Sequence, residues 1–529
     1  MISNKKSVLA LSVASALVLS GCFSDDDDNV VVPPPEPTDP VVVPPESSDP
    51  LALVISANVV DRASNDIVPS TIRFLEGGAV SSNIVDVDGN AITSLSDEEG
   101  AFIFTKKEGA ELSEVTIRVS AEGYFSKDFT VALETSGDST AVNTLLPIVA
   151  KTGDDVSDTT VEASVGTDGT TTSEIVAETT GKAGASAKIP SGVVLQDADG
   201  TAISGAVSLN VSGADSNSSA AALVLPAGLN TGNDSGNVLQ AIGVSNVVMT
   251  AANGKKVKKF SSPITVSMSI PAGKKVNGVE VKTGDMLNLR SHNEDTGVWS
   301  AEEQMVTVGA LNEATNTYNG TFQTDHLTFF AVTRNEPRCD AGVIINTSGA
   351  LVPSSGLLVT LQSSDMGELF GITQDGNTTL LTGPQSSRVN VSSTATASIR
   401  VFDFSGNTWF QSNGEIPVCG TFDTPLTNPV TLVSENVAIT ATCTNDSTVS
   451  TPVPAAVVRY ARGNSSRRVA TNGGSGTYTL SDMVQGQTYT VSVKPRIANA
   501  TGPVTATITA DGTAETINVP VTCSVVTGA

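Results

Sequence analysis

Aromatic residues, histidine and cysteine are all scarce in this chain. Its 529 residues include 2 histidines, 5 cysteines and only 4% Phe, Trp and Tyr together. Any Ser-His-Asp triad would therefore have to use His292 or His326. No segment matches a phosphate-binding P-loop or a strand-to-helix Gly-x-Gly-x-x-Gly motif. The sequence therefore predicts neither an enzyme nor a cofactor, and it places His292 in a surface loop between two strands.

Basic residues are also few. The chain has 29 Lys and Arg against 55 Asp and Glu, which gives a net charge of −26. So acidic a protein repels phosphate backbones. We therefore expect no nucleic acid among its partners.

Helical periodicity is absent outside the N-terminal leader, whereas short alternating runs are frequent. Val115–Ala121, Ile264–Ile270 and Tyr489–Val493 alternate apolar and polar residues, the period of a strand that buries one face and exposes the other. Val, Thr, Ser and Gly predominate between turn residues. The expected fold class is all-β, a tandem array of immunoglobulin-like or transthyretin-like β-sandwiches.

The leader combines a basic and an apolar stretch. Lys5 and Lys6 precede an apolar run from Val8 to Leu19 that is too short to span a bilayer, as in secretory signals. The sequence Leu19-Ser-Gly-Cys22 resembles the lipobox of bacterial lipoproteins. This resemblance implies cleavage before Cys22 and a membrane anchor of acyl chains, including palmitate, on Cys22. The alternative is an ordinary cleaved signal peptide with a chance cysteine.

A polar spacer follows Cys22. It contains the acidic run Asp25–Asp28 and the proline-rich stretch Asn29–Pro50, which predict a disordered tether. At roughly 3.1 Å per residue, about 22 residues in the polyproline conformation reach on the order of 70 Å. Phe23 stands where an aspartate signals inner-membrane retention in enterobacterial lipoproteins, so the resemblance implies the outer membrane.

Two regions share a strand pattern. Asp97–Phe104 is followed by a strand that leads to Gly123-Tyr124, and Gly476–Leu480 with Tyr489–Val493 repeats the order near the C-terminus. This pattern resembles the carboxypeptidase regulatory-like, transthyretin-type β-sandwich, and it implies spacers or binding platforms without peptidase activity. The region 336–430 fits the pattern only loosely.

Four cysteines lie in the last part of the chain. Cys339 and Cys419 are as far apart in the sequence as Cys443 and Cys523. In an exported protein we expect oxidation, and of the three possible pairings these two give equal stapled domains. Metal binding is the alternative, although no Cys-x-x-Cys spacing is present.

The middle region ends in a motif with a chemical implication. Asp325–Val332 resembles the proteolysis-site motif of GAIN domains in adhesion receptors, and more loosely the paired β-domains of ankyrins and netrin receptors. The resemblance implies that Thr328 attacks the peptide bond after Leu327 with His326 as general base. The interpretation that we favour is a closing strand that starts at His326, with Leu327, Phe329 and Ala331 on one face and Thr328 and Phe330 on the other.

Two acidic turns are weak calcium candidates. Asp86 and Asp88 lie before Gly89, and Asp197 and Asp199 lie before Gly200. Asx residues before glycine are also ordinary turn chemistry, and we favour turns without a metal.

Together these patterns predict a chain of six parts. They are a signal peptide (1–21), a tether (22–50), a carboxypeptidase regulatory-like sandwich (51–150), a GAIN-like β-domain of one or two subdomains (151–335), a disulfide-stapled sandwich (336–430) and a disulfide-stapled carboxypeptidase regulatory-like sandwich (431–529). The expected function is that of a non-enzymatic, lipid-anchored surface protein of the outer membrane for adhesion or for binding an extracellular glycan or protein. The alternatives are an envelope structural or assembly lipoprotein that faces the periplasm and, less favoured, autoproteolysis between Leu327 and Thr328.

Overall fold

The computed structural model describes residues 40–133, 140–226, 229, 236–294, 297–353, 355–363, 367–379 and 391–526. Cys22, the leader and most of the predicted tether lie outside the described residues. Contacts group Pro44–Ser524 into one compact unit, and β1 (Val41–Val43) and β41 (Ser524–Val526) form a separate two-stranded sheet. Among the described residues, no helix is long and apolar enough to cross a membrane.

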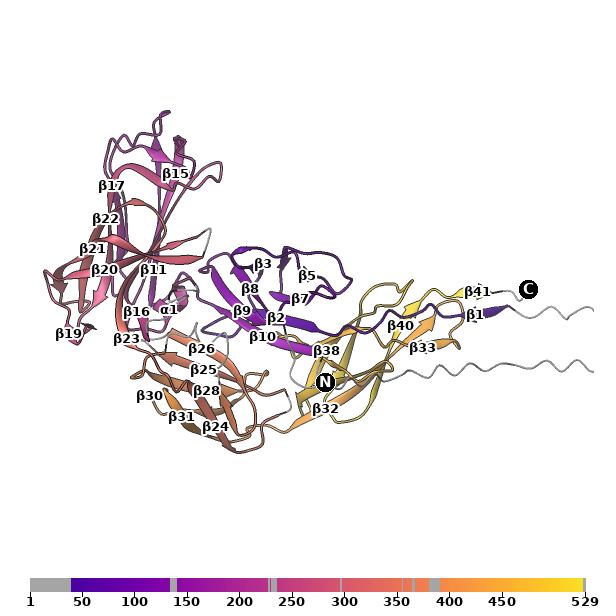
Figure 1. Ribbon diagram of the computed structural model, residues 1–529. Helices are drawn as coiled ribbons and strands as arrows, with labels where there is room; N and C mark the ends of the chain where they lie inside the picture. Colours follow the sequence, from indigo (N-terminus) through magenta and orange to yellow (C-terminus); the bar gives the residue numbers. More distant parts are fainter. Residues whose placement is uncertain are drawn as a thin grey trace, which may run out of the picture. The chain divides into compact units, whose positions relative to one another are not determined.

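The described chain is almost entirely β-structure (Figure 1), so the predicted fold class is confirmed. The expectation of no helix after the leader was wrong at one place, where α1 (Ala220–Val224) forms a single short helix among the described residues. Ala220, Ala221 and Val224 pack in the same apolar cluster as Trp299 and Phe329. Five residues are too few for a helical period to be visible in a sequence.

The strands between 51 and 150 form a two-layer sandwich. One sheet has the order β10-β2-β7-β5, and the other has the order β4-β3-β8-β9 with β6 paired to β3. Phe74 of one sheet and Phe104 of the other are in ring contact at 4.8 Å between centroids, inside the core that the inner faces share. The strands are β2 (Val54–Asp61), β3 (Ser70–Glu76), β4 (Ala79–Val80), β5 (Ile84–Val85), β6 (Ser94–Asp97), β7 (Ala101–Lys106), β8 (Glu114–Ser120), β9 (Lys127–Ala132) and β10 (Ala141–Ile148).

The middle of the chain forms one large sheet of 11 strands. Its order is β11-β15-β16-β23-β20-β21-β22-β17-β13-β12, with β14 paired to β17. One apolar cluster lies around Val332 and Phe330, and a second, which includes α1, lies around Ala331 and Phe329. Alternate residues of β23 therefore enter different cores. The strands are β11 (Val156–Val165), β12 (Ile175–Glu178), β13 (Ala185–Ile189), β14 (Leu195–Gln196), β15 (Gly205–Ala214), β16 (Asn237–Ala251), β17 (Lys259–Pro271), β20 (Met286–Asn293), β21 (Val298–Asn312), β22 (Thr317–His326) and β23 (Phe329–Pro337), with the small hairpin β18 (Lys275–Val276) and β19 (Val279–Glu280).

Two further pairs of sheets follow. Between 336 and 430 the sheets have the orders β27-β24-β31 and β26-β25-β28-β29, and after 430 they have the orders β33-β32-β37-β36 and β35-β34-β38-β39. The strands are β24 (Val343–Gly349), β25 (Leu357–Ser363), β26 (Gly367–Thr373), β27 (Asn377–Thr379), β28 (Thr396–Phe402), β29 (Thr408–Gln411), β30 (Ile416–Pro417), β31 (Gly420–Leu426), β32 (Leu432–Cys443), β33 (Ser450–Pro452), β34 (Val457–Ala461), β35 (Arg468–Val469), β36 (Thr471–Asn472), β37 (Thr477–Val484), β38 (Thr488–Lys494), β39 (Val504–Thr509) and β40 (Glu515–Val521).

Three of these sandwiches share one feature of topology. In each, an early strand and the last strand are neighbours and run parallel: β2 with β10, β24 with β31, and β32 with β40. Parallel strands carry the chain in the same direction. The chain therefore enters each of these sandwiches at one end of the pair and leaves at the other.

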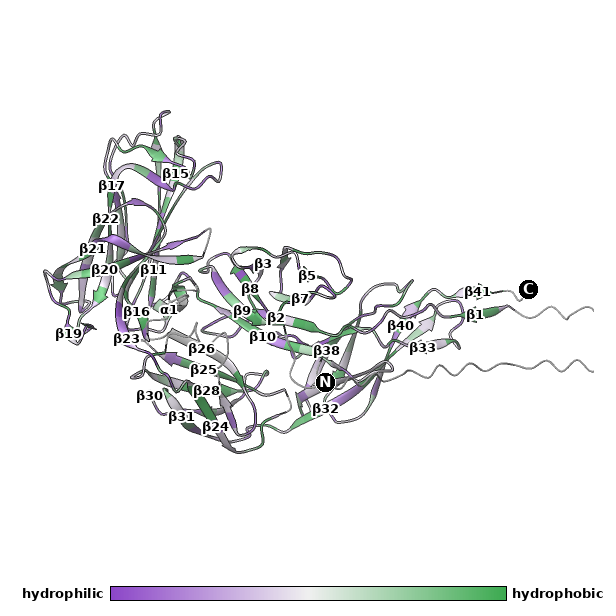
Figure 2. Ribbon diagram, viewed as in Figure 1, coloured by the Kyte–Doolittle hydropathy of each residue, from purple (hydrophilic) through white to green (hydrophobic). Residues whose placement is uncertain are grey.

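The period-two alternation is confirmed in β8 and β38, whose inward residues are buried while the outward ones are at least partly exposed. Hydrophobic and hydrophilic stretches both occur along the strands in Figure 2. In β17 the outward Ser267 is also buried, and its hydroxyl oxygen lies 2.6 Å from that of Ser186. Burial of this polar residue is possible because the partner strand supplies a hydrogen bond.

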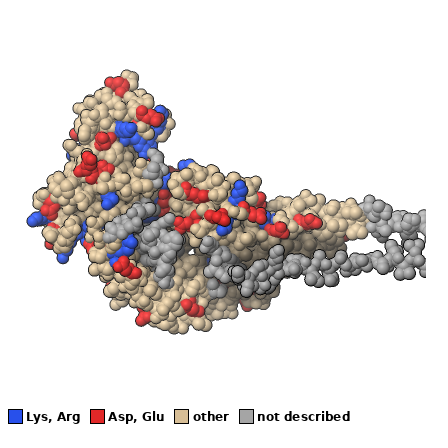
Figure 3. All heavy atoms as spheres, in the orientation of Figure 1, with Lys and Arg blue, Asp and Glu red and all other residues tan. Residues whose placement is uncertain are grey.

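Acidic side chains are spread over the visible face of the described chain rather than gathered in one patch (Figure 3). Several acidic side chains of the described chain pair with lysines. Glu294, for example, lies 3.0 Å from Lys256 Nζ and 2.7 Å from Lys258 Nζ. Such pairs limit the local repulsion that the net charge implies.

Candidate functional site

Thr328, the residue implied as a nucleophile, lies between β22 and β23. It is buried, with 4% of its surface exposed. Its hydroxyl donates a hydrogen bond to the carbonyl oxygen of His292 in β20, and its own carbonyl accepts from the amide of Val247 at 3.1 Å. A nucleophilic hydroxyl must hand its proton to a base. Here the hydroxyl donates instead to a backbone carbonyl. This hydrogen bond links Thr328 to strand β20.

His326, the implied general base, is the last residue of β22. Its Nδ1 lies 3.1 Å from Asp325 Oδ1 and 3.2 Å from Thr324 Oγ1, and its Nε2 lies 3.6 Å from Glu302 Oε1. The ring packs against Phe330 at 5.5 Å between centroids. The structure thus brings His326 together with carboxylates, and the described residues contain no hydrogen bond between His326 and Thr328.

The predicted closing strand was wrong in its start and in the face of Leu327, whereas the opposite faces of Phe330 and of Phe329 with Ala331 are confirmed. β23 begins at Phe329, and Leu327 and Phe330 lie in one apolar cluster while Phe329 and Ala331 lie in the other. The chain bends between β22 and β23, so the alternation starts again at Phe329. If the strand alternation is continued through the bend, Leu327 is assigned to the wrong face.

His292 was also misplaced by the sequence prediction. It lies in β20 and is 4% exposed, not in a surface loop. Its ring contacts Trp299 at 5.1 Å and Phe329 at 6.5 Å between centroids. Neither ring nitrogen has a hydrogen-bond partner among the described residues. Burial lowers the pKa of His292, although Asp128 and Glu294 act in the opposite direction. The aromatic residue directly across the hairpin, Trp299, is the sequence signal that could have indicated a buried position.

The first calcium candidate forms a turn closed by its own side chain. Asp86 Oδ1 accepts hydrogen bonds from the amides of Asp88 at 2.9 Å and Asn90 at 2.8 Å. Asp88 Oδ2 lies 2.6 Å from Lys494 Nζ. The two carboxylates are therefore engaged by amides and a lysine.

The second candidate forms a similar turn, in which the lysine pairs with the first aspartate. Asp197 Oδ1 accepts from the amides of Asp199 at 3.1 Å and Thr201 at 2.9 Å, and its Oδ2 lies 3.1 Å from Lys255 Nζ. The hydrogen bond from Thr201, followed by Lys255, lowers the pKa of Asp197. In the part of the chain that is described, no three His, Cys, Asp or Glu side chains are grouped to hold a metal ion.

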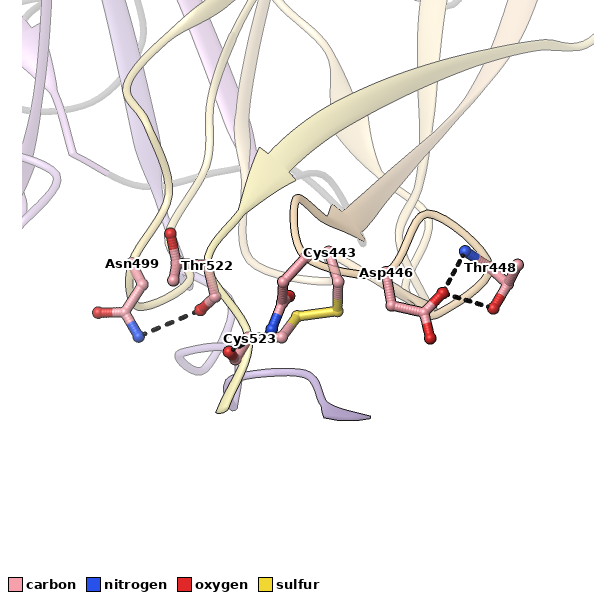
Figure 4. The surroundings of a disulfide bond; sticks show 7 residues. Cys443, Asp446, Thr448, Asn499, Thr522 and Cys523 are labelled. Atoms are coloured by element: carbon pink, nitrogen blue, oxygen red, sulfur yellow. Dashed lines mark hydrogen bonds between the residues drawn. A yellow bond between two sulfur atoms is a disulfide. The ribbon is translucent and has the colours of Figure 1, made fainter. Parts of the chain in front are cut away.

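Two disulfides are present, Cys339–Cys419 and Cys443–Cys523, with Cα atoms 5.5 and 5.4 Å apart. This is the pairing that the equal spacing favours. Cys443 ends β32, and Cys523 lies two residues after β40, so the bond joins the same ends of a parallel pair (Figure 4). Cys339 and Cys419 precede β24 and β31 and join that pair at its start.

Both tryptophans are buried. Trp299 and Trp409 are 7% and 3% exposed. Trp409 Nε1 donates to Asp403 Oδ2 at 3.3 Å within the core of its sandwich, as expected for a core residue. A sugar-stacking surface would therefore need other residues.

No protein-family model matches the chain, and no curated protein matches it. Among solved structures, similarity is found to the minor pilin GBS52 of Streptococcus agalactiae (10% identity, TM-score 0.19, 35% of this chain and 98% of that chain). It is also found to the major pilin subunit BcpA of Bacillus cereus (11%, 0.14, 89% and 99%) and to the Bacillus anthracis TIE protein (10%, 0.14, 71% and 55%). TM-scores this low support no functional argument, and the lipobox, carboxypeptidase regulatory-like and GAIN resemblances stay predictions.

Proposed function

We propose that this chain is a non-enzymatic lipoprotein, anchored to the outer membrane through acyl chains on Cys22. Its β-sandwich body is displayed at the cell surface for adhesion or for binding an extracellular glycan or protein. The leader motif and the acidic, proline-rich tether support the anchor and the display.

The observation that carries the proposal is the position of the two disulfides. Each one joins the first strand of its sandwich to the last, across a sequence separation of 80 residues. A force applied at the two ends of such a sandwich passes through the disulfide. The segment enclosed by the disulfide then carries no force and cannot be extended. This arrangement suits a protein that is pulled at the cell surface.

The anchor is tested by replacing the acylated cysteine. We expect the Cys22→Ser variant to leave the detergent-extracted membrane fraction, whereas a Cys339→Ser and Cys419→Ser double variant stays in it. Equal membrane partitioning of the Cys22→Ser variant and the parent would contradict lipid anchoring.

Surface display is tested by protease treatment of whole cells. We expect the body to be shaved from intact cells. A body that resists protease until the outer membrane is permeabilised would favour the alternative, an envelope structural or assembly lipoprotein that faces the periplasm.

A further inference from the structure

A cavity of about 250 Å³ lies in the middle region of the chain. Strands β16, β20, β21 and β23 and the turn of the β18–β19 hairpin form its walls. Its polar lining includes Arg290, Asn288, Thr333 and Asn335, and Leu239 and Val276 contribute apolar surface. Neither Thr328 nor a disulfide cysteine is among its lining residues.

Arg290 is the unusual member of this lining. It is only partly exposed, and no hydrogen bond or ion pair to its guanidinium occurs within the described residues. Burial lowers the pKa of Arg290, and no neighbouring carboxylate offsets that effect. Other arginines that lack an acidic partner, such as Arg400 and Arg462, donate to hydroxyl or carbonyl oxygens, whereas the guanidinium of Arg290 has no such bond within the described residues.

The nearest charged groups of the wall are occupied elsewhere. Glu302 accepts from the hydroxyl of Ser291 and lies 3.6 Å from His326 Nε2. Arg334 donates to Gln240 Oε1 through Nε at 3.0 Å and Nη2 at 2.7 Å, and its Nε lies 3.3 Å from Glu336. Arg290 is therefore the cation of this cavity that a ligand could pair with.

The chemistry of the lining points to a small acid that also carries hydroxyl groups. A guanidinium recognises a carboxylate with two parallel hydrogen bonds. The side-chain amides of Asn288 and Asn335 and the hydroxyl of Thr333 can both donate to and accept from hydroxyl groups. The volume is just below the range of about 300–1,000 Å³ for drug-sized ligands, which fits one sugar unit. The net charge of the protein disfavours a long polyanion.

We propose that this cavity binds the carboxylate of a single uronate-type sugar unit, with Arg290 as the residue that anchors the carboxylate. The proposal rests on the proposed function, since it names a ligand class for a displayed binding protein.

The test is calorimetric titration of the full chain in detergent with glucuronate and galacturonate. Glucose serves as the uncharged comparison, and acetylglycine represents a peptide C-terminus. We expect one site for a uronate and binding of glucose that is at least about tenfold weaker. Arg290→Gln should weaken uronate binding at least about tenfold. The matched control is Arg73→Gln, the same change at an exposed position in β3, which should bind as the parent does.

The proposal is overturned if neither uronate binds, if Arg290→Gln binds as tightly as the parent, or if acetylglycine binds more tightly than the uronates. An unchanged melting temperature of Arg290→Gln shows that a loss of binding is not a loss of folding. If the folding of this variant is impaired, Arg290→Lys replaces it and should weaken binding less than tenfold but measurably. Failure here leaves the membrane-partitioning and shaving results intact, so it is distinguishable from failure of the proposed function.

Discussion

The side chain of Asn58 in β2 makes two reciprocal hydrogen bonds with the backbone of Arg467, 409 residues later in the sequence. Its Nδ2 donates to the Arg467 carbonyl at 3.0 Å, and its Oδ1 accepts from the Arg467 amide at 2.8 Å. The same carbonyl accepts from Ser56 Oγ at 2.8 Å. Ser56 and Asn58 are both buried. Their hydrogen bonds to the Arg467 backbone connect the first sandwich to the last within the compact unit.

Replacing Asn58 by Leu should destabilise the protein by roughly 1–3 kcal/mol, because the Arg467 amide then loses the side-chain oxygen that accepts its hydrogen bond. The free energy of unfolding in denaturant measures this effect. Asn319→Leu, at an exposed position of β22, is the control and should change stability by much less. An equal effect of the two changes would contradict the importance of the Asn58 bonds.

The buried His292 should make the protein less stable in mild acid. Its folded pKa is below the ordinary value of 6.5 because of burial. Above that pH the ring is neutral in both states. As the pH falls through 6.5, the unfolded chain takes up a proton that the folded chain resists, so the free energy of unfolding decreases. Unfolding measured between pH 7.5 and 5 should show this slope, and His292→Phe should reduce it. A slope that is the same in both proteins would exclude His292 as its origin.

Thr328 should act as a structural residue. Thr328→Val removes the hydrogen bond to the His292 carbonyl and should destabilise the protein by about 1 kcal/mol, whereas Thr328→Ser keeps the hydroxyl and should behave more like the parent. The purified parent should run as one intact band on a denaturing gel. Two fragments that disappear in Thr328→Val would instead establish cleavage after Leu327.

The two disulfides should limit how far the chain extends under force. In single-molecule pulling of the full chain, the two segments enclosed by the disulfides should not extend in the oxidised protein. Each enclosed segment has a sequence separation of 80. Reduction should release about 270 Å of additional contour length for each segment, at roughly 3.3–3.6 Å per residue. The Cys443→Ser and Cys523→Ser double variant should release one such segment without reductant. An extension that does not depend on reductant would rule out the proposed path of force.

Several features could be predicted from the sequence because they depend on neighbouring residues or on simple spacing. Val115–Ala121 and Tyr489–Val493 alternate as strands do, and the equal spacing of the cysteines favoured the pairing that the structure contains. Strand period is a local property, set by side chains that point to opposite faces in turn. The all-β fold class follows from repetition of this local pattern.

Only the tertiary structure decided the contact of Phe329 with His292, the partner of Asn58 and, within the described residues, the lack of a partner for the guanidinium of Arg290. Each depends on a strand from elsewhere in the sequence: Phe329 of β23 contacts His292, and the backbone of Arg467 covers Asn58. From the sequence alone, a polar residue on the outward face of a strand is predicted to be exposed. Whether it is buried is set by the surface that packs against that face, and no local pattern contains this information.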